Sequence, residues 1–118
     1  MPPRGRYRHA STKVGGSIFI FGGVDKNQVR FSDFYEFAIE KREWRSIYVT
    51  GQIPSSRTFH QLAFNNNSIY LFGGNDGTRK NDLFELTISN LKIIDCLHNF
   101  VMIRYVGEGI KELFQQHQ

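Results

Sequence analysis

Apolar and aromatic residues occur in short runs separated by polar, glycine-rich segments, and the runs form two similar sets. The runs Ile18–Phe21 and Ile69–Phe72 are continuous, which is typical of strands buried on both faces. The runs Phe34–Phe37 and Leu83–Leu86 are rich in the aromatic and branched residues that strands favour. The pattern therefore predicts an all-β chain made of short strands.

We predict four antiparallel strands in each set. They cover 8–14, 17–22, 33–39 and 43–49 in the first set, and 59–65, 68–73, 82–88 and 91–96 in the second. Gly15-Gly16 and Asn65–Asn67 supply the chemistry of hairpin turns between the first two strands. Gly22-Gly23 and Gly73-Gly74 follow, where we expect positive φ angles or close approach of neighbouring backbone.

The two sets are copies of one repeat. Each begins P-x-x-R-x-x-H, continues into an apolar run that ends in FGG, and places an Asp two residues later. The paired positions lie 51 residues apart and are Pro3/Pro54, Arg6/Arg57, His9/His60, Phe21/Phe72, Gly22/Gly73, Gly23/Gly74 and Asp25/Asp76. A period near 50 residues indicates a repeat architecture.

The double glycine is followed by a polar loop and by an Asp that opens the next strand, Asp33 in DFYEF and Asp82 in DLFEL. Trp44 follows Asp33 in the first copy. Over residues 3–95 this set resembles the kelch motif, the blade unit of a β-propeller. The resemblance implies two four-stranded blades of a partial β-propeller, with kelch repeats at 1–51 and 52–96.

The second copy departs from the kelch pattern at its end. At the offset of the Asp pair, Trp44 maps to Ile93, so the blade-closing Trp is absent. Residues 97–118 form a divergent tail, which we expect to contain either a strand near 100–106 with a short helix at 110–116, or disordered chain.

Two blades cannot close a ring, because propellers typically have four to eight. We therefore expect exposed apolar sheet faces, which indicate an interaction site or an aggregation liability. Three explanations stay open: a fragment of a longer propeller, which we favour; assembly with other copies or another protein; and a marginal gene product.

Composition narrows the class of partner. The net charge is +4, but the basic residues are scattered and no basic helix or zinc-ligand spacing accompanies them, so we expect an acidic protein partner rather than nucleic acid. The N-terminal segment lacks a signal-peptide core, no apolar run approaches a membrane span, and Cys96 is the single cysteine. A cytoplasmic location is expected, with the nucleus as the alternative.

The duplicated polar residues fit structural roles better than catalytic ones. His9 and His60 occupy the same repeat position, whereas a catalytic set would need one special copy. We expect Asp25 and Asp76 to cap turns and Asp33 and Asp82 to make hydrogen bonds at strand entry. No catalytic residue, metal ligand or cofactor is predicted.

The loops joining the second and third strands differ between copies while the strands match. Because specificity usually resides in loops on a rigid scaffold, we predict partner binding through these loops. The predicted contact residues are Lys26, Asn27, Gln28, Arg30, Asn75, Thr78, Arg79 and Lys80.

The kelch resemblance implies a non-catalytic protein–protein interaction module, an adaptor or scaffold. The alternatives are part of a propeller enzyme of the galactose-oxidase type, for which Cys96 suggests no specific ligand set, and a weak nucleic-acid binder acting through basic loops. Self-association through exposed blade faces is a further expectation.

Overall fold

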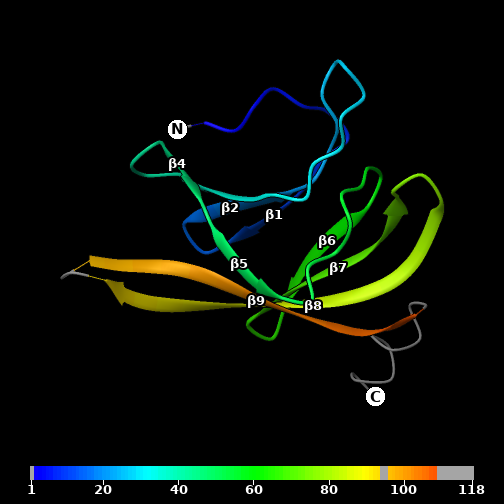
Figure 1. Cartoon of the computed structure of the whole chain (residues 1–118). Helices are drawn as coiled ribbons and strands as arrows, with labels where there is room; N and C mark the ends of the chain where they lie inside the picture. Colours follow the sequence, from blue (N-terminus) through cyan, green and yellow to red (C-terminus); the bar gives the residue numbers. More distant parts are fainter. Residues whose placement is uncertain (1, 94–95, 109–118) are drawn as a thin grey trace.

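The computed structural model describes residues 2–93 and 96–108, which form two β-sheets and no helix. Figure 1 shows the two sheets side by side, with the chain crossing from one to the other along β5. This architecture confirms the prediction of an all-β fold built from partial kelch blades. The predicted helix at 110–116 lies outside the described residues.

The first sheet is an antiparallel meander in the order of the chain. Its strands are β1 (Ala10–Val14), β2 (Ser17–Phe21), β3 (Phe34–Ala38) and β4 (Glu43–Ser46). The β1–β2 hairpin turns at Gly15, whose φ is +57°, and the matching turn of the second sheet uses Asn66 and Asn67 with φ of +49° and +67°. Both predicted hairpin turns are thus confirmed, since such two-residue turns need positive φ.

The second sheet has five strands rather than the predicted four. The order is β5-β9-β8-β7-β6, where the strands are β5 (Tyr48–Gly51), β6 (Gln61–Asn65), β7 (Ser68–Asn75), β8 (Arg79–Ile93) and β9 (Cys96–Glu108). β5 pairs in parallel with β9. The predicted single strand 43–49 is therefore wrong. It divides at the buried Ile47 into β4 and β5, which belong to different sheets.

The fourth strand of the second blade is β9, not the predicted strand 91–96. Residues 91–93 still belong to β8, and 97–108 of the expected tail form most of β9. Leu86 on β8 pairs with Ile103, as Phe37 on β3 pairs with Trp44. The place of Trp44 in the sheet is thus filled by Ile103, which is 2% exposed, and not by Ile93.

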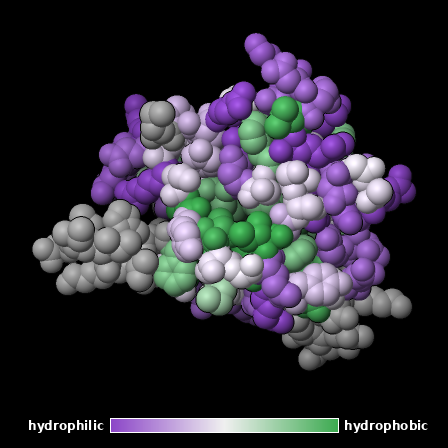
Figure 2. Space-filling view, viewed as in Figure 1, coloured by the Kyte–Doolittle hydropathy of each residue, from purple (hydrophilic) through white to green (hydrophobic). Residues whose placement is uncertain are grey.

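The core lies between the sheets. The first sheet contributes Phe19, Phe21 and Phe34, and the second contributes Ile69, Leu71, Phe84, Leu86, Val101 and Ile103. Three phenylalanines of the first blade thus pack on a mainly aliphatic face of the second, which also contains Phe84. In Figure 2 apolar side chains gather in the centre of one face, near where β5 crosses, with polar residues around them.

The double glycines fix how each blade meets the segment before its first strand. Gly23 and Gly74 have φ near +100°, and all four glycines have positive φ. A Cβ on Gly74 would lie 2.6 Å from the Thr58 carbonyl oxygen, and one on Gly23 would lie 2.9 Å from that of Tyr7. Both expectations for these glycines, positive φ and close backbone approach, are confirmed.

Candidate functional site

The residues predicted to bind a partner lie in two segments, 24–30 and 75–80, which we call the first and second loop, and a chain of contacts connects them. The second is a hairpin tip rather than a free loop, because Asn75 ends β7 and Arg79 and Lys80 begin β8. Gln28 Nε2 donates to the Tyr7 hydroxyl at 3.1 Å, and the neighbouring Arg8 places its guanidinium 4.7 Å from the Phe59 ring centroid. Phe59 in turn lines a hollow with Asn75, Arg79 and Lys80. We call this continuous surface, made of the two loops with Tyr7, Arg8 and Phe59, the loop face.

The first loop is organised by Asp25. Its carboxylate oxygen Oδ1 accepts hydrogen bonds from the backbone N–H groups of Asn27 at 2.9 Å and Val29 at 3.0 Å. Arg4 lies 3.5 Å from the other oxygen. The Val29 N–H, more than the Asn27 N–H and the charge of Arg4, holds the pKa of Asp25 below its usual range.

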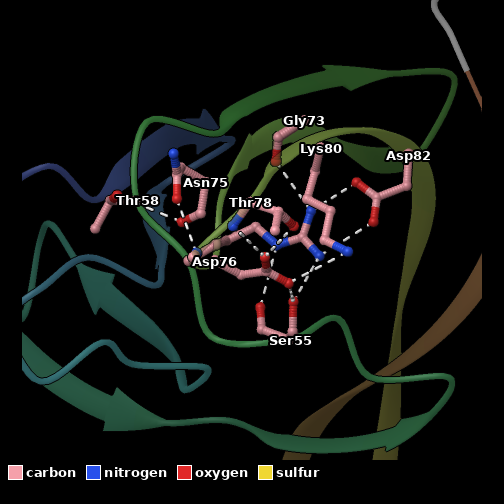
Figure 3. Close-up of polar contacts among 10 residues, drawn as sticks. Ser55, Thr58, Gly73, Asn75, Asp76, Thr78, Lys80 and Asp82 are labelled. Atoms are coloured by element: carbon pink, nitrogen blue, oxygen red, sulfur yellow. Dashed lines mark hydrogen bonds and ion pairs between the residues drawn. The ribbon is translucent and has the colours of Figure 1, made fainter.

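The second loop is organised by Asp76 (Figure 3). The Ser55 hydroxyl donates to Asp76 Oδ2 at 2.6 Å, the Thr78 N–H and hydroxyl donate to Oδ1, and Lys80 Nζ lies 3.5 Å from Oδ2. The Ser55 hydrogen bond is the main cause that lowers the pKa of Asp76 far below its usual range. Asp25 and Asp76 therefore cap turns, as predicted.

Beneath the loops each blade carries the same arginine–aspartate fork. Arg57 donates through Nη1 and Nη2 to the two oxygens of Asp82 at 2.7 and 3.1 Å, and through Nη1 to the Gly73 carbonyl at 2.9 Å. Arg6 binds Asp33 and the Gly22 carbonyl in the same way. The strand-entry aspartates thus bind arginine side chains, which ties the segment before each blade to its third strand.

The two repeated histidines do not have equal environments. His60 is buried and lies edge-on to the Phe21 ring, with Nε2 2.5 Å from the Phe21 carbonyl oxygen in the other blade. Burial lowers the pKa of His60 to about 4. His9 is exposed. The structural role predicted for this position holds at His60, where the ring is part of the contact between blades.

The eight predicted contact residues divide into two groups. Asn75 and Thr78 stabilise the second loop, because Asn75 Oδ1 accepts the Gly77 N–H and Thr78 binds Asp76. Lys80 is half-buried beside Asp76. The side chains that face solvent are those of Lys26, Asn27, Gln28, Arg30 and Arg79.

Sequence reasoning missed three residues of the loop face, which are Tyr7, Arg8 and Phe59. Arg8 and Phe59 lie one position before the repeated histidine and have φ of +59° and +61°. Phe59 is 63% exposed. The available signal was weak: all four x positions of the P-x-x-R-x-x-H motif differ between the copies, and this position is one of them.

Two hollows open on the loop face. One, of about 460 Å³, is lined by the N-terminal segment and the first loop, at Arg4, Gly5, Arg6, Tyr7, Asp25, Lys26 and Asn27. The other, of about 330 Å³, is lined by Phe59, Gly74, Asn75, Arg79 and Lys80. Both combine an aromatic ring with basic side chains, a lining suited to acidic groups that carry apolar neighbours.

Comparison with known proteins agrees with the fold. Residues 1–99 match the KLHDC2/KLHL20/DRC7 Kelch-repeats domain family, so the chain belongs to the kelch-repeat proteins. It is 30% identical over 95 residues to the leucine-zipper-like transcriptional regulator 1 homolog of Drosophila melanogaster, covering 75% of this chain and 10% of that protein.

Two further relatives have names that refer to different functions, an effector protein and a sulfolyase. The chain is 40% identical over 75 residues to the mouse (Mus musculus) Rab9 effector protein with kelch motifs, covering 60% of this chain and 20% of that protein. It is 38% identical over 63 residues to the N-(sulfonatooxy)prop-2-enimidothioate sulfolyase of Thlaspi arvense, covering 52% of this chain and 18% of that protein. The chain thus spans a fifth or less of each of these three relatives.

Residues 2–93 and 96–108 contain no group of three or more His, Cys, Asp or Glu side chains placed to hold a metal ion. The same part of the chain has no helix with the length and apolar character needed to cross a membrane.

Proposed function

We propose that this kelch-repeat protein is a non-catalytic interaction module, an adaptor or scaffold, that binds a protein partner through the loop face in the cytoplasm. The observation that carries the proposal is the contrast between engaged and solvent-facing polar groups. The buried Arg57 donates to the carboxylate of the half-buried Asp82 and to the Gly73 carbonyl. On the variable loops, by contrast, the basic side chains of Lys26, Arg30 and Arg79 face solvent.

The catalytic alternative has less support from this site. The His60 ring nitrogen Nε2 is engaged by the Phe21 carbonyl, and Asp25 and Asp76 are engaged by turn N–H groups and hydroxyls. These groups act within the scaffold. The lyase activity named for the Thlaspi arvense relative belongs to that protein, of which the chain covers 18%.

A comparison of two charge-removal variants tests the proposal. The loop variant replaces Lys26, Arg30 and Arg79 with Ser, and the control variant replaces Lys13, Lys41 and Arg42, which are equally exposed outside the two loops. Proteins crosslinked to the wild-type chain in cell extract are expected to persist with the control and to be lost with the loop variant. Equal recovery with both variants would count against the loop face.

We also propose that the 118-residue chain associates head to tail with a second copy. In the core, Phe19 and Phe34 of the first blade pack on Ile69 and Leu86 of the second. The outward faces carry the matching positions: Ile18 is the repeat counterpart of Ile69. A second copy can therefore repeat the contact that already joins the two blades.

Light scattering after size-exclusion chromatography tests this association. Met102 is 52% exposed and pairs with Thr87, which pairs with Ser68, so it lies on the outward face of the second sheet. Met102→Glu is expected to shift an oligomer to monomer, while Val29→Glu in the first loop leaves it unchanged. A monomeric wild-type chain would disprove the association.

A further inference from the structure

Arg8 and Phe59 occupy the same place in the two blades and share an unusual backbone. Both have φ near +60°, a region that bulky residues seldom adopt. The cause lies in the double glycines. The Thr58 carbonyl and the His60 backbone N–H occupy the space that a Cβ on Gly74 would need, and the Tyr7 carbonyl and the His9 Cα do the same at Gly23, so the residue between them turns outward.

The blade geometry thus imposes a conformation in which glycine would fit without strain. Burial does not explain a phenylalanine there, because Phe59 is 63% exposed. Strained positions of this kind concentrate at functional sites, where the side chain serves a purpose outside the fold. The pair is also organised: the Phe59 N–H donates to the Arg8 carbonyl, and the Arg8 guanidinium lies over the Phe59 ring.

The surroundings of Phe59 specify what it would bind. Arg8 and Arg79 place positive charge around the ring. The nearby carboxylate of Asp76 is already engaged by Ser55, Thr78 and Lys80. The hollow of about 330 Å³ beside the ring is large enough for one or two side chains. An acidic segment with an apolar or aromatic residue would complement both the charge and the exposed ring.

We propose that Phe59 and Arg8 form the specificity-determining centre of the loop face, and that they bind an acidic segment of a partner protein through one apolar or aromatic side chain packed on Phe59. This inference rests on the proposed interaction function and deepens it. It adds to the predicted loop residues the two that lie between the loops. Residues of this aromatic and arginine type dominate binding energy in interfaces generally.

The test is selection from a random peptide library displayed on phage, using the immobilised 118-residue chain. Selected peptides are expected to be enriched in Asp and Glu and to carry an apolar or aromatic residue. Fluorescence anisotropy then measures their affinity for wild type, Phe59→Gly, and Tyr48→Ala as the matched control. Tyr48 is 70% exposed on β5, where the second sheet ends.

Phe59→Gly is expected to weaken binding about tenfold without lowering the melting temperature, because glycine relieves the positive φ. Tyr48→Ala is expected to leave affinity unchanged. Peptides that bind Phe59→Gly as well as wild type would overturn this inference and leave the interaction function standing. Failure to select any peptide would overturn both.

One further outcome would assign the loop face to nucleic-acid binding instead. Aromatic and basic groups together also bind single-stranded nucleic acid by stacking and charge. Tighter binding of a fluorescent oligothymidylate than of any selected peptide, with steep loss on adding salt and sensitivity to Phe59→Gly, would overturn the assignment to an acidic protein segment.

Discussion

Replacing Arg57 with Ala is expected to be among the more destabilising single changes in the second blade. Arg57 is 1% exposed and donates five hydrogen bonds, to the two oxygens of Asp82, the Gly73 carbonyl, and the Ser55 carbonyl and hydroxyl. Its removal leaves the Asp82 carboxylate, whose side chain is 16% exposed, without a counter-charge. Breaking a buried pair in this way costs about 3–5 kcal/mol of unfolding free energy.

The first blade supplies the matched comparison. Arg6 makes the same fork, but the Asp33 side chain is 35% exposed, so water can solvate the carboxylate after Arg6→Ala. We expect that change to cost about 1–2 kcal/mol, closer to the loss of a partly solvated charged hydrogen bond. The two variants thus measure how the burial of the carboxylate changes the free energy lost when the same ion pair is removed.

Urea unfolding followed by Trp44 fluorescence and circular dichroism gives both free energies. The slope against urea should stay unchanged, which shows that the variants differ in stability and not in the surface exposed on unfolding. A double-mutant cycle of Arg57→Ala with Asp82→Ala should give a coupling energy of at least about 2 kcal/mol. A cost for Arg57→Ala no larger than that for Arg6→Ala would refute the argument from burial.

Three further predictions concern single residues. Burial lowers the pKa of His60 from 6.5 to about 4, so the unfolded chain binds the proton more readily than the folded chain. The free energy of unfolding should therefore fall by about 3 kcal/mol as the pH drops from 6.5 to 4. His60→Gln should flatten this dependence in urea titrations repeated across that pH range. Gly74→Ala, which meets the Thr58 carbonyl, should lower the free energy of unfolding by about 2 kcal/mol or more, against about 1 kcal/mol for Gly15→Ala, whose added methyl meets open space. Arg104→Ala should cost at most about 1 kcal/mol in the same assay, since the Arg104 side chain is 59% exposed beside Glu85; a larger loss would show a less solvated pair.

Local chemistry was enough to predict much of the fold. The hairpin turns and the double glycines carry their own conformational preferences, so Gly15, Asn66 and Gly74 could be read from sequence. Features that depend on distant contacts could not. The chain divides at Ile47 because that side chain enters the core between sheets. The strand β9 lacks the repeat motif and takes its place from pairing with β8.

The candidate site was likewise predictable only where its signal lies in the local sequence. The loops were predicted because they vary between copies, and the structure connects them through Tyr7, Arg8 and Phe59. The positive φ of Arg8 and Phe59 arises from backbone packing against Gly23 and Gly74, which only the assembled blades reveal. Residue type alone gave no reason to prefer Phe59 over other exposed aromatic residues.

Because β5 pairs in parallel with β9, the boundary between the two sequence repeats does not coincide with the boundary between the two sheets. Residues Tyr48–Gly51 end the first repeat in sequence but form the outer edge of the second sheet, where the Gln52 N–H donates to the Ile103 carbonyl at 2.9 Å. An excised second repeat that starts after Gly51 would leave β9 with an unpaired edge. Anyone dissecting or recombining these blades should therefore cut before Ile47, since the second blade takes its edge strand β5 from the end of the first repeat.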